Sequence, residues 1–238
     1  MPPGILNPTV PDFAALSAAS SSASAFNMEP HITAIFAAKT SQESLEASLA
    51  LCNEIVANAA TAHHVVAKLL PEAAKAAADK KSGNNRESAM IVYGALYETL
   101  PTKAPATEVL LVETIGIVFD GLADKGAVVR ESAQYAVDAL FGVLKQPALV
   151  SGLLGAVQNY CKSAGSKWQG KVGAYTLIGK MAEKAVKADQ TQGEVFLKDV
   201  MGRELEGLIP VVEAGMHDLK SEVCMPTLPC LNRMLMGA

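Results

Sequence analysis

The sequence predicts an all-α fold built as a solenoid of stacked helical pairs, and three observations support this prediction. Half of the 238 residues are hydrophobic but only 5% are aromatic, so alanine supplies much of the apolar surface. Closely packed helices suit that composition, whereas β-sandwiches do not. Apolar residues also recur at helical spacing from about residue 40 to about residue 220, with no convincing alternating strand segment. Finally, the chain repeats itself at a fixed period.

The repeat is clearest in two segments. ADKKSGNNRESAMIVYGALYETL begins at Ala78, and ADKGAVVRESAQYAVDALFGVL begins at Ala123. Their shared Arg-Glu-Ser-Ala starts at Arg86 and at Arg130, 44 residues apart, and a weaker copy, KVGAYTLIGKM, starts 41 residues later at Lys171. A period of about 40 to 47 residues with two helices per unit is typical of HEAT and armadillo repeats. We therefore expect a HEAT/armadillo-like α-solenoid of about four to five helical pairs.

Each helix can be placed from its caps and its spacing. Thr40 and Glu43 form a predicted capping box, and apolar residues follow at helical spacing: Leu45, Leu49, Cys52 and Val56. The first helices of the later pairs are expected at 65–78, 108–122, 148–162 and 196–217. The second helices begin near the three basic residues of the repeat. Small residues on them predict close approach of neighbouring helices: Ala89, Gly94, Ala133, Ala136, Gly173 and Ala174.

The two ends of the chain differ from the repeats. Residues 1–28 contain several prolines and a Ser/Ala run, a composition that predicts a disordered leader. The solenoid is expected over 29–223. The last segment, 224–238, reads CMPTLPCLNRMLMGA, and Pro226 and Pro229 would break a continuing helix. We therefore predict an atypical tail and, as a hypothesis, a truncated gene product.

The stretch GSKWQGKVG, residues 165–173, is similar to a phosphate-binding P-loop. Gly165 is followed by four residues and then by Gly170 and Lys171. A P-loop needs Ser or Thr after the lysine, whereas Val172 stands there, and it follows a strand, whereas the preceding segment is predicted to be helical. The repeat offers another interpretation, in which these glycines surround a helix–helix turn. The sequence shows no catalytic constellation either, so we expect a non-enzymatic chain that needs no cofactor or metal.

Charge and cysteine content suggest the compartment. The net charge is −4 and the pI is about 5.6, so any nucleic-acid binding requires a local basic face. The four cysteines lack metal-ligand spacing and no signal peptide is evident, which predicts reduced thiols in a cytoplasmic protein. The uncharged run 146–161 is too short and too interrupted to span a membrane.

Three short motifs carry a resemblance to a known family. They are Lys167-Trp168-Gln169, Leu208-Ile209-Pro210-Val211, and Asp218 with Lys220, Glu222 and Val223. Together with the repeats they make residues 65–223 similar to the N-terminal HEAT region of fungal translation elongation factor 3-like proteins, including the paralogue associated with a prion. The resemblance implies a ribosome-bound ABC-F ATPase whose HEAT region contacts the small subunit while two cassettes hydrolyse ATP.

This chain holds the HEAT region and neither cassette. The resemblance therefore implies a monomeric ribosome-binding module that acts in translation and contacts small-subunit rRNA and ribosomal proteins. ATP and magnesium would be needed only by the full-length family protein. A generic HEAT scaffold for protein–protein interaction is the alternative function.

Basic residues near the turns are the candidate contacts with the ribosome. Because repeats place equivalent turns along one edge, these residues could form a phosphate-binding strip: Lys80, Lys81, Arg86, Lys125, Arg130, Lys162, Lys167 and Lys171. The alternative is a solvated face on which Arg86 and Arg130 pair with the glutamates that follow them. Trp168, the only tryptophan, is expected in the repeat core, with base stacking as the alternative.

Overall fold

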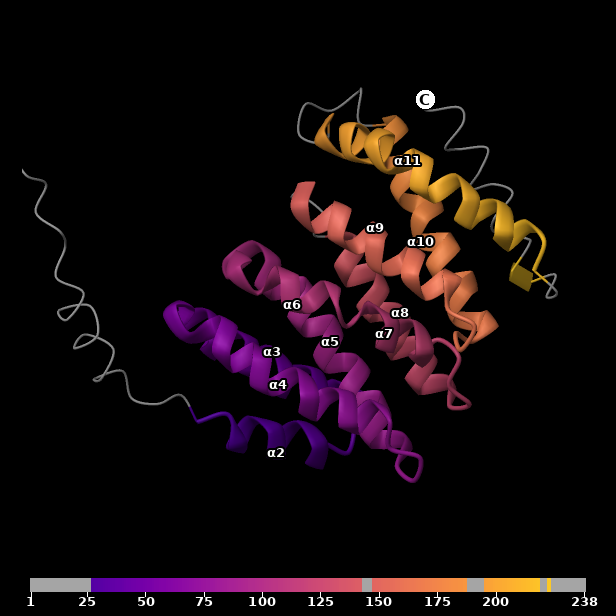
Figure 1. Ribbon diagram of the computed structural model, residues 1–238. Coiled ribbons are helices and arrows are strands. Elements are labelled where there is room, and N and C mark those ends of the chain that lie inside the picture. Colours follow the sequence, from indigo (N-terminus) through magenta and orange to yellow (C-terminus); the bar gives the residue numbers. More distant parts are fainter. Residues whose placement is uncertain (1–26, 143–146, 188–194, 219–221, 224–238) are drawn as a thin grey trace, which may run out of the picture.

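The computed structural model describes residues 27–142, 147–187, 195–218 and 222–223. Over these ranges the regular structure is helical, and the helices stack in sequence order from α2 to α11 (Figure 1). The predicted all-α solenoid is thus confirmed. The expected leader falls outside the described residues except for Asn27 and Met28, and the expected tail, 224–238, falls wholly outside them.

The described helices form four and a half pairs. The first pair is α2 (Glu29–Ala37) with α3 (Ser41–Ala57), and the second is α4 (Ala62–Ala77) with α5 (Gly83–Lys103). In the third, α6 (Glu108–Val112) and α7 (Ile115–Gly121) together precede α8 (Ala127–Gly142). The fourth is α9 (Pro147–Lys162) with α10 (Trp168–Lys187), and α11 (Val195–Met216) starts the next unit. Single 3₁₀ turns stand before α4 (Ala59–Thr61) and α6 (Pro105–Thr107).

A buried hydroxyl accompanies the break between α6 and α7, where one continuous helix was expected. The Thr114 hydroxyl donates to the Leu111 carbonyl at 2.7 Å and also bonds the Tyr97 hydroxyl of α5 at 2.7 Å. A threonine that hydrogen-bonds to the backbone in this way competes with helical bonding. The remaining first helices begin and end within three residues of their predicted bounds.

The capping box at the start of α3 is confirmed, and Leu49 and Val56 are partly buried against the core. The Thr40 hydroxyl accepts from the Glu43 amide at 3.2 Å, while the Glu43 carboxylate accepts from the Lys39 amide at 2.8 Å. Of the four expected apolar positions only Cys52 is fully buried. The buried face consists of Ser44, Ser48, Leu51, Cys52 and Ile55.

Helix α5 lies at the centre of the fold and packs against α3, α4 and α8. Its contact with α8 is close because Gly94 faces the Tyr135 ring, leaving no room for a Cβ. Helix α10, by contrast, touches α8 at only a few points and packs mainly on α7, α9 and α11. The stack of second helices is therefore tight from α3 to α8 and open between α8 and α10. Among the described helices, none has the length and apolar character needed to cross a bilayer.

Candidate binding edge and groove

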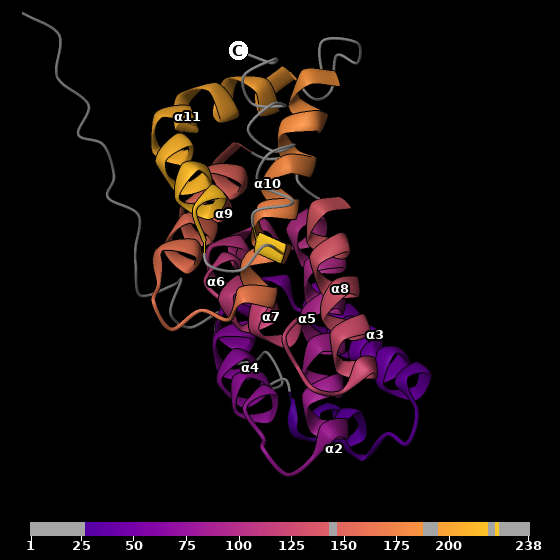
Figure 2. The ribbon, with the colours of Figure 1, turned by 90° about the vertical axis from the view of Figure 1, so that its right-hand side faces the viewer.

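Within each helical pair, a turn joins the first helix to the second, and these turns lie along one edge of the solenoid. Figure 1 shows the α4–α5, α7–α8 and α9–α10 turns on this edge, and Figure 2 views it from the front. We call it the turn edge. Eight basic residues were predicted as candidate contacts, and six of them lie on this edge and are exposed: Lys80, Lys81, Lys125, Arg130, Lys162 and Lys167. Within the described residues, none of these six forms an ion pair.

Arg86 does not belong to that exposed set. Its side chain is 10% exposed and binds Asp124 of the next turn through two bonds, from Nε at 2.7 Å and from Nη2 at 3.1 Å. Its Nη1 donates to the carbonyls of Asp79 and Ser82, at 2.8 and 3.1 Å. Four of the five guanidinium N–H groups are thus used inside the protein. The prediction that Arg86 offers a free surface charge is corrected.

Arg130 occupies the equivalent position one repeat later and is exposed. Its Nη1 donates to the carbonyls of Asp124 and Lys125, at 2.8 and 3.1 Å, as the Nη1 of Arg86 does within its own turn. Its Nε and Nη2 have no partner among the described residues. Among the described residues, neither Arg86 nor Arg130 forms an ion pair with the glutamate that follows it. Glu87 accepts a bond from the Ser41 hydroxyl instead.

Lys171, the third repeat-opening base, pairs with Asp218 at 3.5 Å, and both side chains are about four-fifths buried. This contact repeats the pattern of Arg86 with Asp124: a base at the start of a second helix meets an aspartate of the next turn. We call such a contact an inter-repeat pair. Sequence reasoning missed these pairs, although the aspartate of ADKK and ADKG recurs at the same place in the repeat.

The aspartates of the turns are held by internal bonds. Asp79 accepts from the amides of Lys81 and Ser82 and from the Asn85 side chain, and these bonds lower its pKa. Burial by itself would raise the pKa of Asp124, but hydrogen bonds from Arg86 and from the Gly126 amide outweigh it and hold that pKa below its ordinary value. These two carboxylates are therefore engaged in bonds within the protein, while the lysines of the same turns are exposed.

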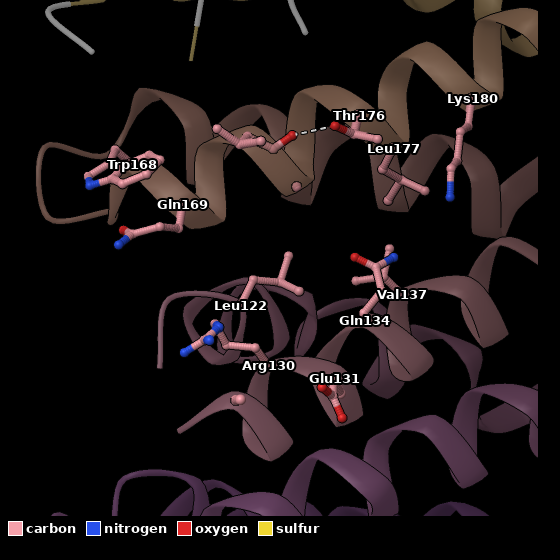
Figure 3. Close-up of a pocket in the computed structure, with 13 residues that line it drawn as sticks. Leu122, Arg130, Glu131, Gln134, Val137, Trp168, Gln169, Thr176, Leu177 and Lys180 are labelled. Atoms are coloured by element: carbon pink, nitrogen blue, oxygen red, sulfur yellow. Dashed lines mark hydrogen bonds between the residues drawn. The ribbon is translucent and has the colours of Figure 1, made fainter. Parts of the chain in front are cut away.

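A groove of about 460 Å³ separates α8 from α10 (Figure 3). Leu122, Val137, Val172 and Leu177 supply apolar lining, and Trp168 and Arg130 stand on opposite sides near one end. Trp168 is only half-buried. It packs against the core, as the interpretation of it as a core residue expects, but part of it also faces this groove.

Two of the three glycines of GSKWQGKVG, Gly170 and Gly173, serve helix packing. A Cβ at Gly170 would lie 2.8 Å from the backbone oxygen of Phe119 and closer still to the Tyr160 hydroxyl. A Cβ at Gly173 would collide with Leu122. Because α10 starts at Trp168 and both glycines lie inside it, this stretch forms no phosphate-binding loop.

The buried thiols offer no reactive group. Burial raises the pKa of Cys52 and of Cys161 to about 12, so both remain protonated at neutral pH. Nor do the described histidine, cysteine, aspartate and glutamate side chains form any group of three or more that could hold a metal ion.

A comparison with protein families agrees with this architecture. A family model described as the EF3 N-terminal HEAT repeat matches residues 45–226. The mRNA export factor elf1 of Schizosaccharomyces pombe is 32% identical over 157 residues, which are 66% of this chain and 13% of that protein. The [NU+] prion formation protein 1 of Saccharomyces cerevisiae is 26% identical over 138 residues, 58% of this chain and 10% of that protein. The chain thus spans about a tenth of the length of these relatives. A crystal structure of an engineered protein aligns with 90% of this chain and 98% of its own at TM-score 0.39 and 11% identity.

Proposed function

The chain belongs to the EF3 N-terminal HEAT repeat family, and from this premise we propose that it binds the small ribosomal subunit through its turn edge and acts in translation. The proposed contact is with rRNA phosphates and neighbouring ribosomal protein, and this chain itself performs no chemistry. ATP hydrolysis would belong to cassettes elsewhere in a full-length family protein. One relative is named an mRNA export factor, and contact with RNA would be common to that name and to this proposal.

The arrangement of charge at the turn edge carries the proposal. The protein is acidic overall, yet on this edge Asp79 and Asp124 are engaged by internal bonds while lysines of the same turns are exposed. Exposed lysines on successive turns recur along the solenoid, as phosphates recur along a nucleic-acid strand. Lysine binds phosphate as a compact point charge, so such an array favours affinity without base specificity.

Co-sedimentation with fungal ribosomes across a salt series tests the proposal. We expect binding to weaken as salt rises, because neutralised phosphates release counterions on association. The variant Lys80→Glu/Lys81→Glu/Lys167→Glu should reduce the salt slope by about one for each phosphate that the chain no longer neutralises.

The control variant Lys68→Glu/Lys103→Glu reverses two exposed charges on α4 and at the end of α5, away from the three turns. It should bind as the unmodified chain does. Failure of the folded chain to sediment with ribosomes at low salt, or an equal loss in both variants, would refute the proposal.

A further inference from the structure

The regular series of inter-repeat pairs has one gap. Arg86 reaches Asp124 in the next turn, and Lys171 reaches Asp218 after α11. By the same pattern, the aspartate that pairs with Arg130 is expected in the α9–α10 turn. Residues 163–167 of that turn are Ser-Ala-Gly-Ser-Lys, without an acidic side chain. The gap coincides with the open contact between α8 and α10, where the groove lies.

The geometry of Arg86 shows what Arg130 is prepared to bind. In Arg86, Nη1 is fixed by two carbonyls of its own turn, and Nε with Nη2 then hold a carboxylate as a fork. The Nη1 of Arg130 is fixed by two carbonyls in the same way, at 2.8 and 3.1 Å. Its remaining fork, Nε with Nη2, is therefore oriented in advance, and a guanidinium fork matches the two oxygens of a carboxylate.

Arg130 lies at an apolar hollow with an aromatic wall. Figure 3 shows it across the groove from Trp168 and Gln169, with Val137 and Leu177 farther along the two helices. A hollow of this size lies within the range of about 300 to 1,000 Å³ found for ligand sites. Apolar side chains can fill it, while the amide of Gln169 and the indole N–H of Trp168 can bond a peptide backbone.

The charges around the groove favour a peptide over a nucleic-acid strand. Glu131 follows Arg130 on the same wall, and Lys180 at the other end is already paired with Asp138 at 3.0 Å. The lining therefore offers one unpaired cation beside an exposed carboxylate, so it can accept a single negative charge. A polyanionic backbone lying in the groove would meet Glu131 and would have Arg130 as the single unpaired cation of the lining.

We infer that the α8–α10 groove binds a partner peptide that places one carboxylate on the free fork of Arg130 and apolar side chains between the two helices. The partner's carboxylate takes the place that Asp124 has at Arg86, and it completes the missing inter-repeat pair. This inference goes beyond the proposed ribosome contact. It stands or falls separately, since that contact is tested at Lys80, Lys81 and Lys167.

The single tryptophan makes the test direct, because Trp168 lines the groove and reports alone on its polarity. The probe is a blocked nine-residue peptide with two leucines one helical turn apart and one glutamate, and its twin carries glutamine in place of glutamate. Titration of the full chain should shift the Trp168 emission to saturation with the glutamate peptide. The glutamine twin should bind about tenfold more weakly or worse, as expected for a lost hydrogen-bonded charge.

Variants at Arg130 complete the test. Arg130→Met should weaken the glutamate peptide to the level of its twin, and Arg130→Lys should also weaken it because the fork is lost although the charge remains. Arg203→Met is the matched control, since Arg203 is an exposed arginine on α11 whose Nε bonds only a carbonyl of its own helix, that of Asp199. It should leave binding unchanged.

Several results would overturn the inference. One is equal binding of the two peptides, and another is a glutamate-peptide affinity that Arg130→Met does not change. A Trp168 shift with inorganic phosphate or a short oligouridine, but not with the peptide, would assign the groove to nucleic acid instead. A groove already filled by residues 224–238 or by a second copy would leave the Trp168 emission insensitive to every probe, and that result also excludes an outside partner.

Discussion

Arg86 and Arg130 begin the same four-residue motif, yet one is buried in the solenoid and the other is exposed at a groove. Each is held by carbonyls of its own turn, so the local structure of the motif is the same. They differ in the following repeat, which supplies Asp124 to Arg86 and no acidic residue to Arg130. The two arginines thus differ in one partner that the following repeat does or does not supply.

The largest expected effect comes from breaking the inter-repeat pair of Arg86. Its side chain and that of Asp124 are 10% and 15% exposed, so Asp124→Ala would leave a nearly buried guanidinium without its partner. We expect a loss of about 3 kcal/mol in the free energy of unfolding, measured by urea denaturation. Asp138→Ala, which breaks the exposed pair with Lys180, is the control and should cost less than about 1 kcal/mol. Similar losses in the two variants would contradict the structural role of the Arg86–Asp124 pair.

The close approach of α10 to α7 gives the next largest effect. Gly170→Ala places a methyl group 2.8 Å from the backbone oxygen of Phe119, which cannot move without shifting α7. This should cost about 2 kcal/mol of unfolding free energy. Gly155 lies in the neighbouring helix α9 with no atom within 4 Å of its Cβ position, so Gly155→Ala should instead gain about 0.5 to 1 kcal/mol. If Gly170→Ala proved neutral, the stretch GSKWQGKVG would lose its packing explanation.

The pH dependence of stability offers a further test of the Arg86 pair. Since the folded-state pKa of Asp124 lies below its unfolded value of about 4, the contribution of this pair is complete well above pH 4 and is lost as the pH falls through the folded pKa. The stability difference between the unmodified chain and Asp124→Ala should therefore narrow between pH 5 and pH 2, as seen in urea unfolding at each pH. The hydrogen bonds from Lys81, Asn85 and Ser82, which chiefly lower the pKa of Asp79, are present in both proteins, so their effect cancels in the difference. A difference that stayed constant down to the lowest pH would show that the carboxylate charge is not what binds Arg86.

The sequence could predict what is local. Helix positions follow from spacing and caps within single segments, so the predicted helical pairs lie where expected. Lys171, predicted for the exposed strip, instead joins Asp218 in an inter-repeat pair. The buried state of Arg86 depends on Asp124, 38 residues away, and no local pattern marks that contact. Likewise, Ser44 and Ser48 look polar in sequence, but small side chains allow α3 to approach α5, and the Ser48 hydroxyl bonds the Ser44 carbonyl within the helix. The groove depends on the spacing of α8 and α10, which emerges only when the repeats are assembled.

The smallest expected effect comes from supplying the missing carboxylate. The turn aspartate stands seven residues before Arg86 and six before Arg130, so the matching positions before Lys171 are Ala164 and Gly165. Ala164 is exposed and can accept a larger side chain. Ala164→Asp should pair with the free fork of Arg130 and raise the free energy of unfolding by about 0.5 to 1 kcal/mol, as expected for an accessible ion pair. It should also weaken binding of the glutamate peptide toward the level of its glutamine twin, because the fork is then occupied.

A double-variant cycle separates this effect from general charge balance. Lys162 and Lys167 flank the α9–α10 turn, and an aspartate between them would gain some stability without any contact to Arg130. In the Arg130→Met background the gain from Ala164→Asp should fall to the part that Lys162 and Lys167 supply, if the new pair forms. If the gain is the same with and without Arg130, it comes from the neighbouring lysines. The difference between Arg86 and Arg130 would then lie in the spacing of α8 and α10, and not in one missing aspartate.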